Sequence, residues 1–273
     1  MVKMGAVWDR TAEFLTDNLS AVLPVALIAF YVPASIQGNF ADLASGGGET
    51  LALILALVNL AFAVLGLWGS LTLIAMAGAG EDRVEAGALA TRRLGPALLV
   101  LSLLLGATCL LFAPLPVVLL AQGFDAGEVL SGKVEVGGAL AWGLGGYCLA
   151  LVAALLFAAT RLAIVTPAIV VESRALSAIA RSFAMTRGHM FAILGVVVLY
   201  TVVTVVAILA ARLVFGSIFH LLVDGEEGMS LATVLTSITT AAVQTGFTVL
   251  PPVFSAKLFL ALRAADATDG HRM

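Results

Sequence analysis

The chain has 273 residues, of which 61% are hydrophobic and only 11% are charged, and its mean hydropathy is +1.10. A soluble domain needs roughly a quarter of its residues charged to cover its surface, so this composition excludes an ordinary soluble protein. The net charge of −3, with no basic run longer than Arg92-Arg93, argues against nucleic-acid binding. We therefore expect a protein with lipid as the solvent for much of its surface.

The predicted elements, in chain order, are one short amphipathic helix and six apolar spans. Residues 4–17 place Trp8, Ala12 and Leu15 on one helical face, which is typical of a helix at the membrane interface. The spans are predicted at 19–37, 50–79, 96–122, 137–171, 190–217 and from near Ser230 onward. The second and fourth runs exceed the roughly 20 residues that cross a bilayer, so they must tilt or project beyond it.

Charged links and prolines separate these spans. Residues 81–94 and 172–189 are predicted to be charged cytoplasmic links. Proline removes a helical hydrogen bond, so Pro167 should bend or end the fourth run and Pro251-Pro252 should interrupt the sixth span. No linker is long enough to separate domains, and a single polytopic membrane domain is expected over 1–273. A loose similarity between the segments around the two links leaves an internal duplication open.

The distribution of basic residues predicts the orientation. Twelve of the fourteen Lys and Arg residues fall in alternate gaps, which a six-span topology places on one side of the membrane. Basic residues near span ends are retained in the cytoplasm. The expected fold class is therefore an all-α integral bundle of six transmembrane helices with interfacial amphipathic helices. We expect it in a bacterial inner membrane with both termini cytoplasmic.

The second link carries the residues best suited to contact a ligand. Ser173 is expected to cap a helix that begins at Arg174 and carries Arg181 on the same face. Arginines at this depth have the paired N–H donors that hold a lipid phosphate. The candidate contact site for a lipid phosphate or a partner is Arg161, Glu172, Arg174, Arg181, Ser182 and Arg187. Topology alone also predicts basic residues here, with Glu172 pairing one of them.

These residues also carry a resemblance. The pattern Arg161-x5-Pro167-x4-Glu172-x8-Arg181-Ser182, followed by Arg187-Gly188 and a new span, resembles the membrane domain of bacterial glycerophosphoryl diester phosphodiesterases. It is similar, too, to six-span inner-membrane proteins related to that domain. The resemblance covers residues 161–200. In that family the hydrolase is a separate soluble domain, so the resemblance implies a membrane module and transfers no catalytic residue.

A second candidate site lies along the sixth span. Five polar residues recur there at three- and four-residue spacing: Thr233, Ser237, Thr240, Gln244 and Thr248. Polar groups facing lipid are unfavourable, so this stripe should face the bundle. Together with Asn59 of the second span it would line a polar cavity. The alternative is that these hydroxyls only bond to their own backbone or between helices.

The remaining residues limit the function classes. Three scattered His residues give no basis for a metal site, and no cofactor is expected. We expect a non-enzymatic membrane protein that binds anionic lipid, a membrane-protein partner or a second copy of itself through the basic link. The alternative is a transporter or exporter of a small amphipathic solute. An intramembrane enzyme is the third hypothesis, with only Glu172 as an obvious base.

Overall fold

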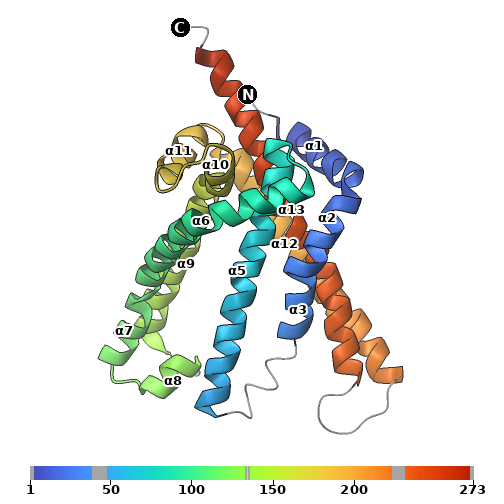
Figure 1. Cartoon of the computed structure of the whole chain (residues 1–273). Coiled ribbons are helices and arrows are strands. Elements are labelled where there is room, and N and C mark those ends of the chain that lie inside the picture. The colour runs from blue at the N-terminus through green and yellow to red at the C-terminus, as the bar shows by residue number, and fades with distance from the viewer. Residues whose placement is uncertain (1–2, 39–47, 133, 135, 223–230, 271–273) are drawn as a thin grey trace.

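The computed structural model describes residues 3–38, 48–132, 134, 136–222 and 231–270. Within these ranges the secondary structure is entirely helical and contains no strand (Figure 1). The helices are α1 (Met4–Asp17), α2 (Leu19–Ala26), the π-helical η1 (Leu27–Tyr31), α3 (Val32–Gln37), α5 (Glu49–Ala79), α6 (Arg83–Phe112), α7 (Pro114–Ala121), α8 (Ala126–Ser131), α9 (Gly138–Leu162), α10 (Val165–Val171), α11 (Ser177–Met185), α12 (Met190–Leu222) and α13 (Leu231–Gly270).

Six helical segments of the described chain are long and apolar enough to cross a membrane. They are Leu19–Gln37, Thr50–Ala79, Arg83–Ala121, Gly138–Val171, Met190–Phe219 and Thr233–Ala267. Each overlaps one predicted span, so the prediction of an all-α fold with six helices that could cross a membrane is confirmed. The predicted start of the last span at Ser230 lies outside the described residues.

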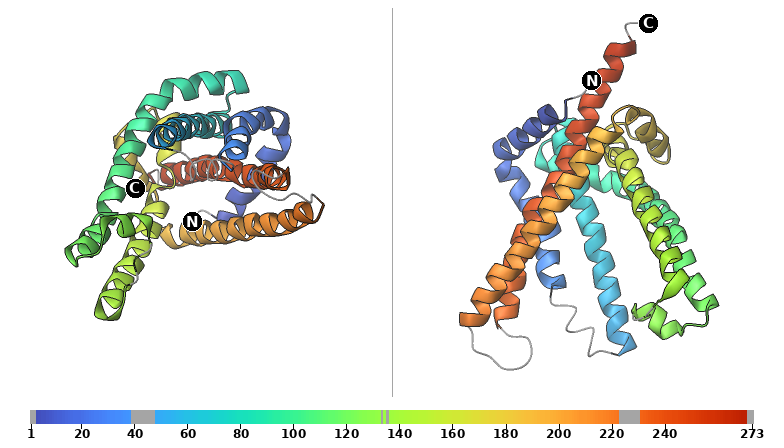
Figure 2. Two further views of the ribbon diagram at one scale, coloured as in Figure 1. Left: turned by 90° about the horizontal axis from the view of Figure 1, so that it is seen from below. Right: turned by 180° about the vertical axis from the view of Figure 1, so that it is seen from behind.

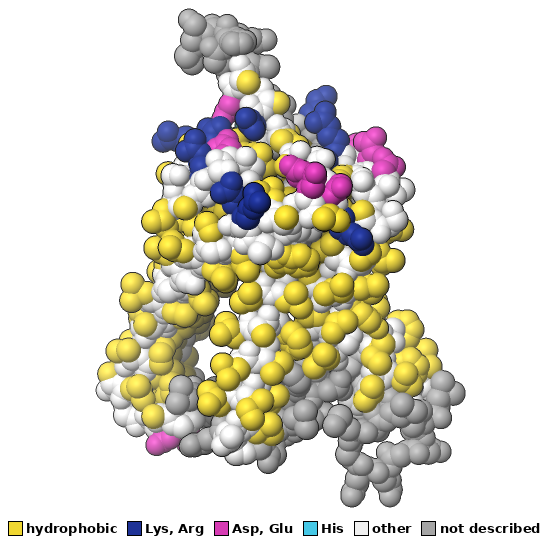
Figure 3. All heavy atoms as spheres, in the orientation of Figure 1, with side chains coloured by type: hydrophobic (Ala, Val, Ile, Leu, Met, Phe, Trp, Pro, Cys, Tyr) yellow, Lys and Arg dark blue, Asp and Glu magenta, His cyan; other side chains and the backbone are white. Residues whose placement is uncertain are grey.

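Both ends of the chain lie at the same end of the bundle (Figure 1). The two charged links, 81–94 and 172–189, meet there, and Lys and Arg side chains gather on that part of the surface (Figure 3). We call it the basic end. An even number of spans returns the chain to the side on which it began, so this arrangement follows directly from the topology.

The tightest packing of the bundle is at the basic end. On α5, Leu71 and Leu73 near that end are completely buried, whereas Leu53, Leu57 and Leu60 are 58–63% exposed. The helices diverge toward the opposite end, as the rear view in Figure 2 shows, and the space-filling view shows an opening between α5 and the pair of α6 and α9 (Figure 3). Apolar side chains on the diverging halves are therefore exposed instead of packed against other helices.

The first predicted link, 81–94, proves to be largely helical. Asp82 caps α6, because its Oδ1 accepts hydrogen bonds from the backbone N–H groups of Val84 and Glu85, both at 2.9 Å. The helix then continues through the link into the third span. It contains Pro96 and is visibly bent when seen from below (Figure 2). Proline is a usual cause of such a bend, since it removes one hydrogen bond of the helix.

The fourth predicted run is divided into two helices. α9 ends at Leu162 and α10 begins at Val165. The break lies at Ala163-Ile164, and Ala163 carries the carbonyl that the ring of Pro167 would strike in a continuous helix. The predicted bend is thus confirmed. Most of α10 is buried, so it fills the interior beneath the basic end instead of facing lipid.

The interruption predicted at Pro251-Pro252 is wrong, because α13 continues through both prolines. Pro251 has no N–H to donate to the carbonyl of Phe247 four residues earlier. Tyr200 of α12 donates its hydroxyl to that carbonyl at 2.9 Å. A side chain of the neighbouring helix therefore supplies the missing donor, as membrane helices require when they contain proline.

The amphipathic helix α1 is present, and the face that it buries within the protein lies one position from the apolar face named in the sequence. Val7 and Thr11 are buried at 2% and 1%, whereas Trp8 is 44% exposed and Ala12 is exposed. Thr11 is accommodated because its hydroxyl donates to the carbonyl of Val7 at 2.8 Å. α1 packs on α13 with this face, so tertiary contact selected a face that apolarity alone did not predict.

Candidate functional site

The first residues of the second link do not fold as predicted. Ser173 does not cap a helix: it has φ +57°, and α11 begins only at Ser177 after a non-helical turn. Its hydroxyl instead accepts a hydrogen bond from the guanidinium of Arg93 on α6. The two basic links are therefore joined to each other. Arg93 was not predicted at this site, because its contact lies 80 residues away in the chain and no local pattern reports it.

Two of the predicted arginines are neutralised by acidic residues. The carboxylate of Glu172 accepts from Nε of Arg174 at 2.7 Å, and Nε of Arg181 lies 3.5 Å from the same oxygen. Arg181 also pairs with Asp266 of α13 at 3.5 Å. These three contacts form a network that connects the link to the last helix. Arg174 and Arg181 are consequently less available to an external phosphate.

The other two arginines line a pocket of about 300 Å³ at the basic end. Its lining consists of Phe157, Arg161, Phe183, Ala184 and Arg187. No carboxylate is among these residues, and the guanidinium of Arg187 makes no hydrogen bond or ion pair with any described residue. The pocket therefore combines two positive charges with two aromatic side chains.

Arg161 is held in this pocket from several directions. Its guanidinium carbon lies 5.3 Å from the ring centre of Phe157, and Nη1 donates to the carbonyl of Phe183 at 3.4 Å. Nε is buried and has no partner within the described chain. The hydroxyl of Ser182, itself fully buried, donates to the carbonyl of Arg161 at 2.5 Å. Because α9 ends here, that carbonyl lacks a helical donor, and Ser182 supplies one.

The six predicted site residues thus separate into different roles. Arg161 and Arg187 line one pocket, and Ser182 positions the first of them. Glu172, Arg174 and Arg181 form the ion-pair network beside it. Charge and spacing could not distinguish these roles, because all four arginines lie in or next to the same charged link.

The polar stripe of the sixth span is brought only partly to a cavity. Gln244 and Thr248 line a cavity of about 200 Å³ together with Gln37 and Thr245. Asn59 lies next to it, and its Oδ1 accepts from Nε2 of Gln37 at 2.8 Å. Asn59 therefore does not line the cavity as predicted, and it bonds instead to Gln37, the polar residue at the end of the first span that does.

The remaining stripe residues serve packing. Ser237 approaches Gly38 so closely that a side chain there would lie 3.2 Å from its Cβ. Thr240 is 5% exposed and its hydroxyl has no partner among the described residues, but neither it nor the half-buried Thr233 lines the cavity. Thr248 donates its hydroxyl to the carbonyl of Gln244 at 2.8 Å, so backbone bonding also accounts for part of the stripe.

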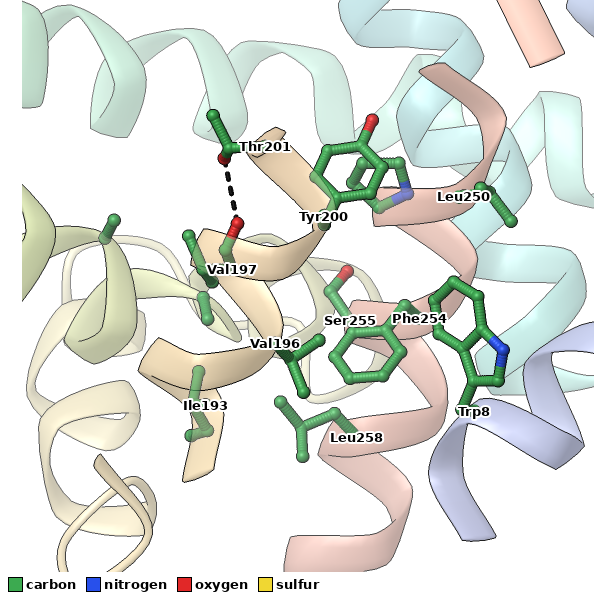
Figure 4. A pocket seen from close by; sticks show the side chains of 13 residues that line it. Trp8, Ile193, Val196, Val197, Tyr200, Thr201, Leu250, Phe254, Ser255 and Leu258 are labelled. Carbon is green, nitrogen blue, oxygen red and sulfur yellow. Dashed lines mark hydrogen bonds between the residues drawn. The ribbon is translucent and has the colours of Figure 1, made fainter. Parts of the chain in front are cut away.

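A third pocket, of about 290 Å³, is formed where α1, α9, α12 and α13 meet (Figure 4). Trp8 and Phe254 stand on one side, with ring centres 6.1 Å apart, and the side chains of Ile193 and Val196 face them from α12. The hydroxyl of Thr201 is bonded to its own backbone at 2.8 Å. The hydroxyls of Tyr200 and Ser255 are likewise bonded to backbone carbonyls, and the rest of the lining is mostly apolar, so this pocket suits an apolar chain.

Comparisons with known proteins and the arrangement of metal-binding side chains suggest no further function. The chain matches no model of a known protein family, no curated protein and no solved structure. Within the described residues, no three His, Cys, Asp or Glu side chains come together in a group that could hold a metal ion. The site has to be interpreted from its own geometry.

Proposed function

We propose that the protein is a non-enzymatic, single-domain component of a bacterial inner membrane, with both termini in the cytoplasm, and that it binds anionic lipid. The orientation rests on the basic residues, which collect at the end where the termini meet. In this orientation the pocket of Arg161 and Arg187 lies at the level of the cytoplasmic headgroups. The ligand is the phosphate of an anionic phospholipid.

The observation that carries this proposal is the unequal pairing of the arginines. Arg174 and Arg181 have carboxylate partners, whereas the pocket of Arg161 and Arg187 has none in its lining. Two guanidinium groups without a counter-ion attract a phosphate strongly, because they form charge-assisted hydrogen bonds to its oxygens. Phe157 and Phe183, both about two-fifths exposed, offer apolar contact to the acyl chains beside such a headgroup.

Lipid retention by purified protein tests the proposal. Protein exchanged into mixed micelles of phosphatidylglycerol and phosphatidylcholine should retain phosphatidylglycerol, quantified by mass spectrometry of the extracted lipid. The double variant Arg161→Gln, Arg187→Gln should reduce that retention about tenfold or more, since each charge-assisted bond contributes about 1.5–3 kcal/mol. Arg174→Gln is the matched control, because Glu172 already engages this arginine. Equal retention by all three proteins would refute lipid binding at this pocket.

The resemblance of residues 161–200 to a diesterase membrane domain supports a related biological setting. We place the protein as a membrane module that acts beside a separate partner, which can be another membrane protein or a second copy of this chain. Its own residues provide no catalytic arrangement in this proposal. Cross-linking in native membranes, followed by mass spectrometry, would identify the partner or show that the chain acts alone.

The cavity containing Gln244 supports transport of a small amphipathic solute as a second candidate function. Four polar side chains from the first and sixth spans line it within an otherwise apolar bundle. Gln244→Leu should then abolish flux in proteoliposomes. Thr239→Val is the control, since Thr239 bonds to its own backbone and does not line the cavity. Unchanged flux in the Gln244 variant would reject this candidate.

A further inference from the structure

Another pocket at the basic end carries charges of both signs and is lined by residues of α1, α2, α5, α13 and the start of α6, helices that can be followed in Figure 1. Its volume is about 390 Å³, and its lining includes Asn18, Glu81, Asp82, Arg83 and Lys257. It shares no lining residue with the pocket of Arg161 and Arg187. We call it the corner pocket.

The two cations of the corner pocket, Lys257 and Arg83, differ in how they are bonded. Lys257 of α13 donates to the carbonyl of Ala77 near the end of α5 at 2.9 Å, and its Nζ lies 4.6 Å from the ring centre of Phe14. Lys257 is therefore fixed at the wall. Arg83 makes no side-chain hydrogen bond or ion pair with any described residue, so its guanidinium is available to a ligand.

The acidic groups of the corner pocket lie at the start of α6. Asp82 uses Oδ1 to cap the helix, and the carboxyl groups of Glu81 and Glu85 are within hydrogen-bonding reach of each other. Two carboxyl groups of the lining, those of Glu81 and Asp82, thus stand beside the two cations. A ligand that carries both an ammonium and a phosphate complements this arrangement better than an anion does.

An apolar groove continues from the corner pocket toward the bilayer. It measures about 370 Å³, and its lining includes Pro24, Ile28, Trp68, Thr72 and Arg83. On α2 and α5 these residues lie one to two turns further from the basic end than those of the corner pocket, about 5–10 Å along each helix. Arg83 lines both spaces.

Polar groups in the groove are already bonded within the protein. Nε1 of Trp68 donates to the hydroxyl of Thr91 at 3.1 Å, and the hydroxyl of Thr72 donates to the carbonyl of Trp68 at 2.9 Å. The groove therefore suits a hydrocarbon chain. A charged compartment followed by an apolar one, in the direction from water to lipid, has the order of parts found in a phospholipid.

We propose that the corner pocket and its groove bind a zwitterionic phospholipid with a primary ammonium headgroup. Arg83 and Lys257 contact the phosphate, Glu81 and Asp82 contact the ammonium, and an acyl chain lies along Ile28 and Trp68. This goes beyond the anionic-lipid site, since it concerns another surface and another lipid class. A free headgroup would use the same charges, but only the intact lipid also fills the groove.

The test measures lipids retained from micelles that contain equal amounts of phosphatidylethanolamine, phosphatidylcholine and phosphatidylglycerol. Arg83→Gln should reduce retained phosphatidylethanolamine about tenfold, the effect of losing about 1.4 kcal/mol. Glu81→Gln should abolish the preference for phosphatidylethanolamine over phosphatidylcholine, whose ammonium cannot donate hydrogen bonds. Arg92→Gln, an exposed arginine of the same helix that lines neither space, should change nothing.

Further arms keep the result decisive. Ile28→Trp fills the groove without touching a charge, and should also reduce phosphatidylethanolamine retention while the protein remains monodisperse. Unchanged retention in both Arg83→Gln and Ile28→Trp overturns the proposal, as does displacement of the lipid by an equal concentration of free phosphoethanolamine. The anionic-lipid proposal is judged separately, because it depends on retained phosphatidylglycerol in the Arg161 and Arg187 variants.

Discussion

The hydrogen bond between Tyr200 and the carbonyl of Phe247 provides a sharp test of how this bundle tolerates proline. Tyr200→Phe removes the hydroxyl that donates at 2.9 Å, and Pro251 cannot replace it because it has no N–H. Hydrogen bonds between membrane helices contribute about 0.6 kcal/mol on average and up to about 1.7 kcal/mol. Since this carbonyl loses its interhelical donor without regaining a helical one, we expect a loss near the upper value, about 1.5 kcal/mol.

A double-mutant cycle combines Tyr200→Phe with a second substitution, Pro251→Ala. Alanine restores the backbone N–H, so the carbonyl of Phe247 regains a helical donor and Tyr200→Phe should cost less than about 0.5 kcal/mol in that background. The expected coupling is about 1 kcal/mol, roughly a fivefold difference in the unfolding equilibrium. Other effects of either substitution cancel in the cycle, provided that the two act independently.

Reversible unfolding in mixed micelles with increasing SDS, followed by tryptophan fluorescence or circular dichroism, measures all four proteins. A coupling indistinguishable from zero would refute the argument, because it would mean that Tyr200 stabilises α13 in some other way than by satisfying the carbonyl that Pro251 leaves free.

Two further substitutions test close packing and the support of the arginine pocket. A methyl group at Gly69 would overlap that of Ala29, so Gly69→Ala should destabilise the protein by about 1–3 kcal/mol, whereas Gly66→Ala, with its nearest neighbour 3.8 Å away, should be neutral or stabilising in the same unfolding assay. Ser182→Ala should cost about 1–2 kcal/mol and weaken phosphatidylglycerol retention, because the carbonyl of Arg161 loses its donor; unchanged stability and retention would contradict that role.

The amino-acid sequence by itself determined the all-α class and the number of helices long and apolar enough to cross a membrane. Apolar runs predict membrane spans directly. Each span must bond its backbone N–H and C=O groups within its own helix and exclude charged side chains over about 20 residues. The bend before Pro167 was also predictable, since a proline acts on the carbonyl four residues earlier in its own chain. These are local effects, and local effects are visible in the sequence.

The tertiary structure alone decided what depends on neighbours far away in the chain. Pro251 does not interrupt α13, because Tyr200 of another helix bonds to the freed carbonyl. In the sequence the four arginines in and next to the second link look alike, and only the positions of Glu172 and Asp266 separated the paired ones from Arg161 and Arg187. Hydropathy and charge place a residue along the membrane normal. Helix packing decides which of the side chains at one depth contact each other.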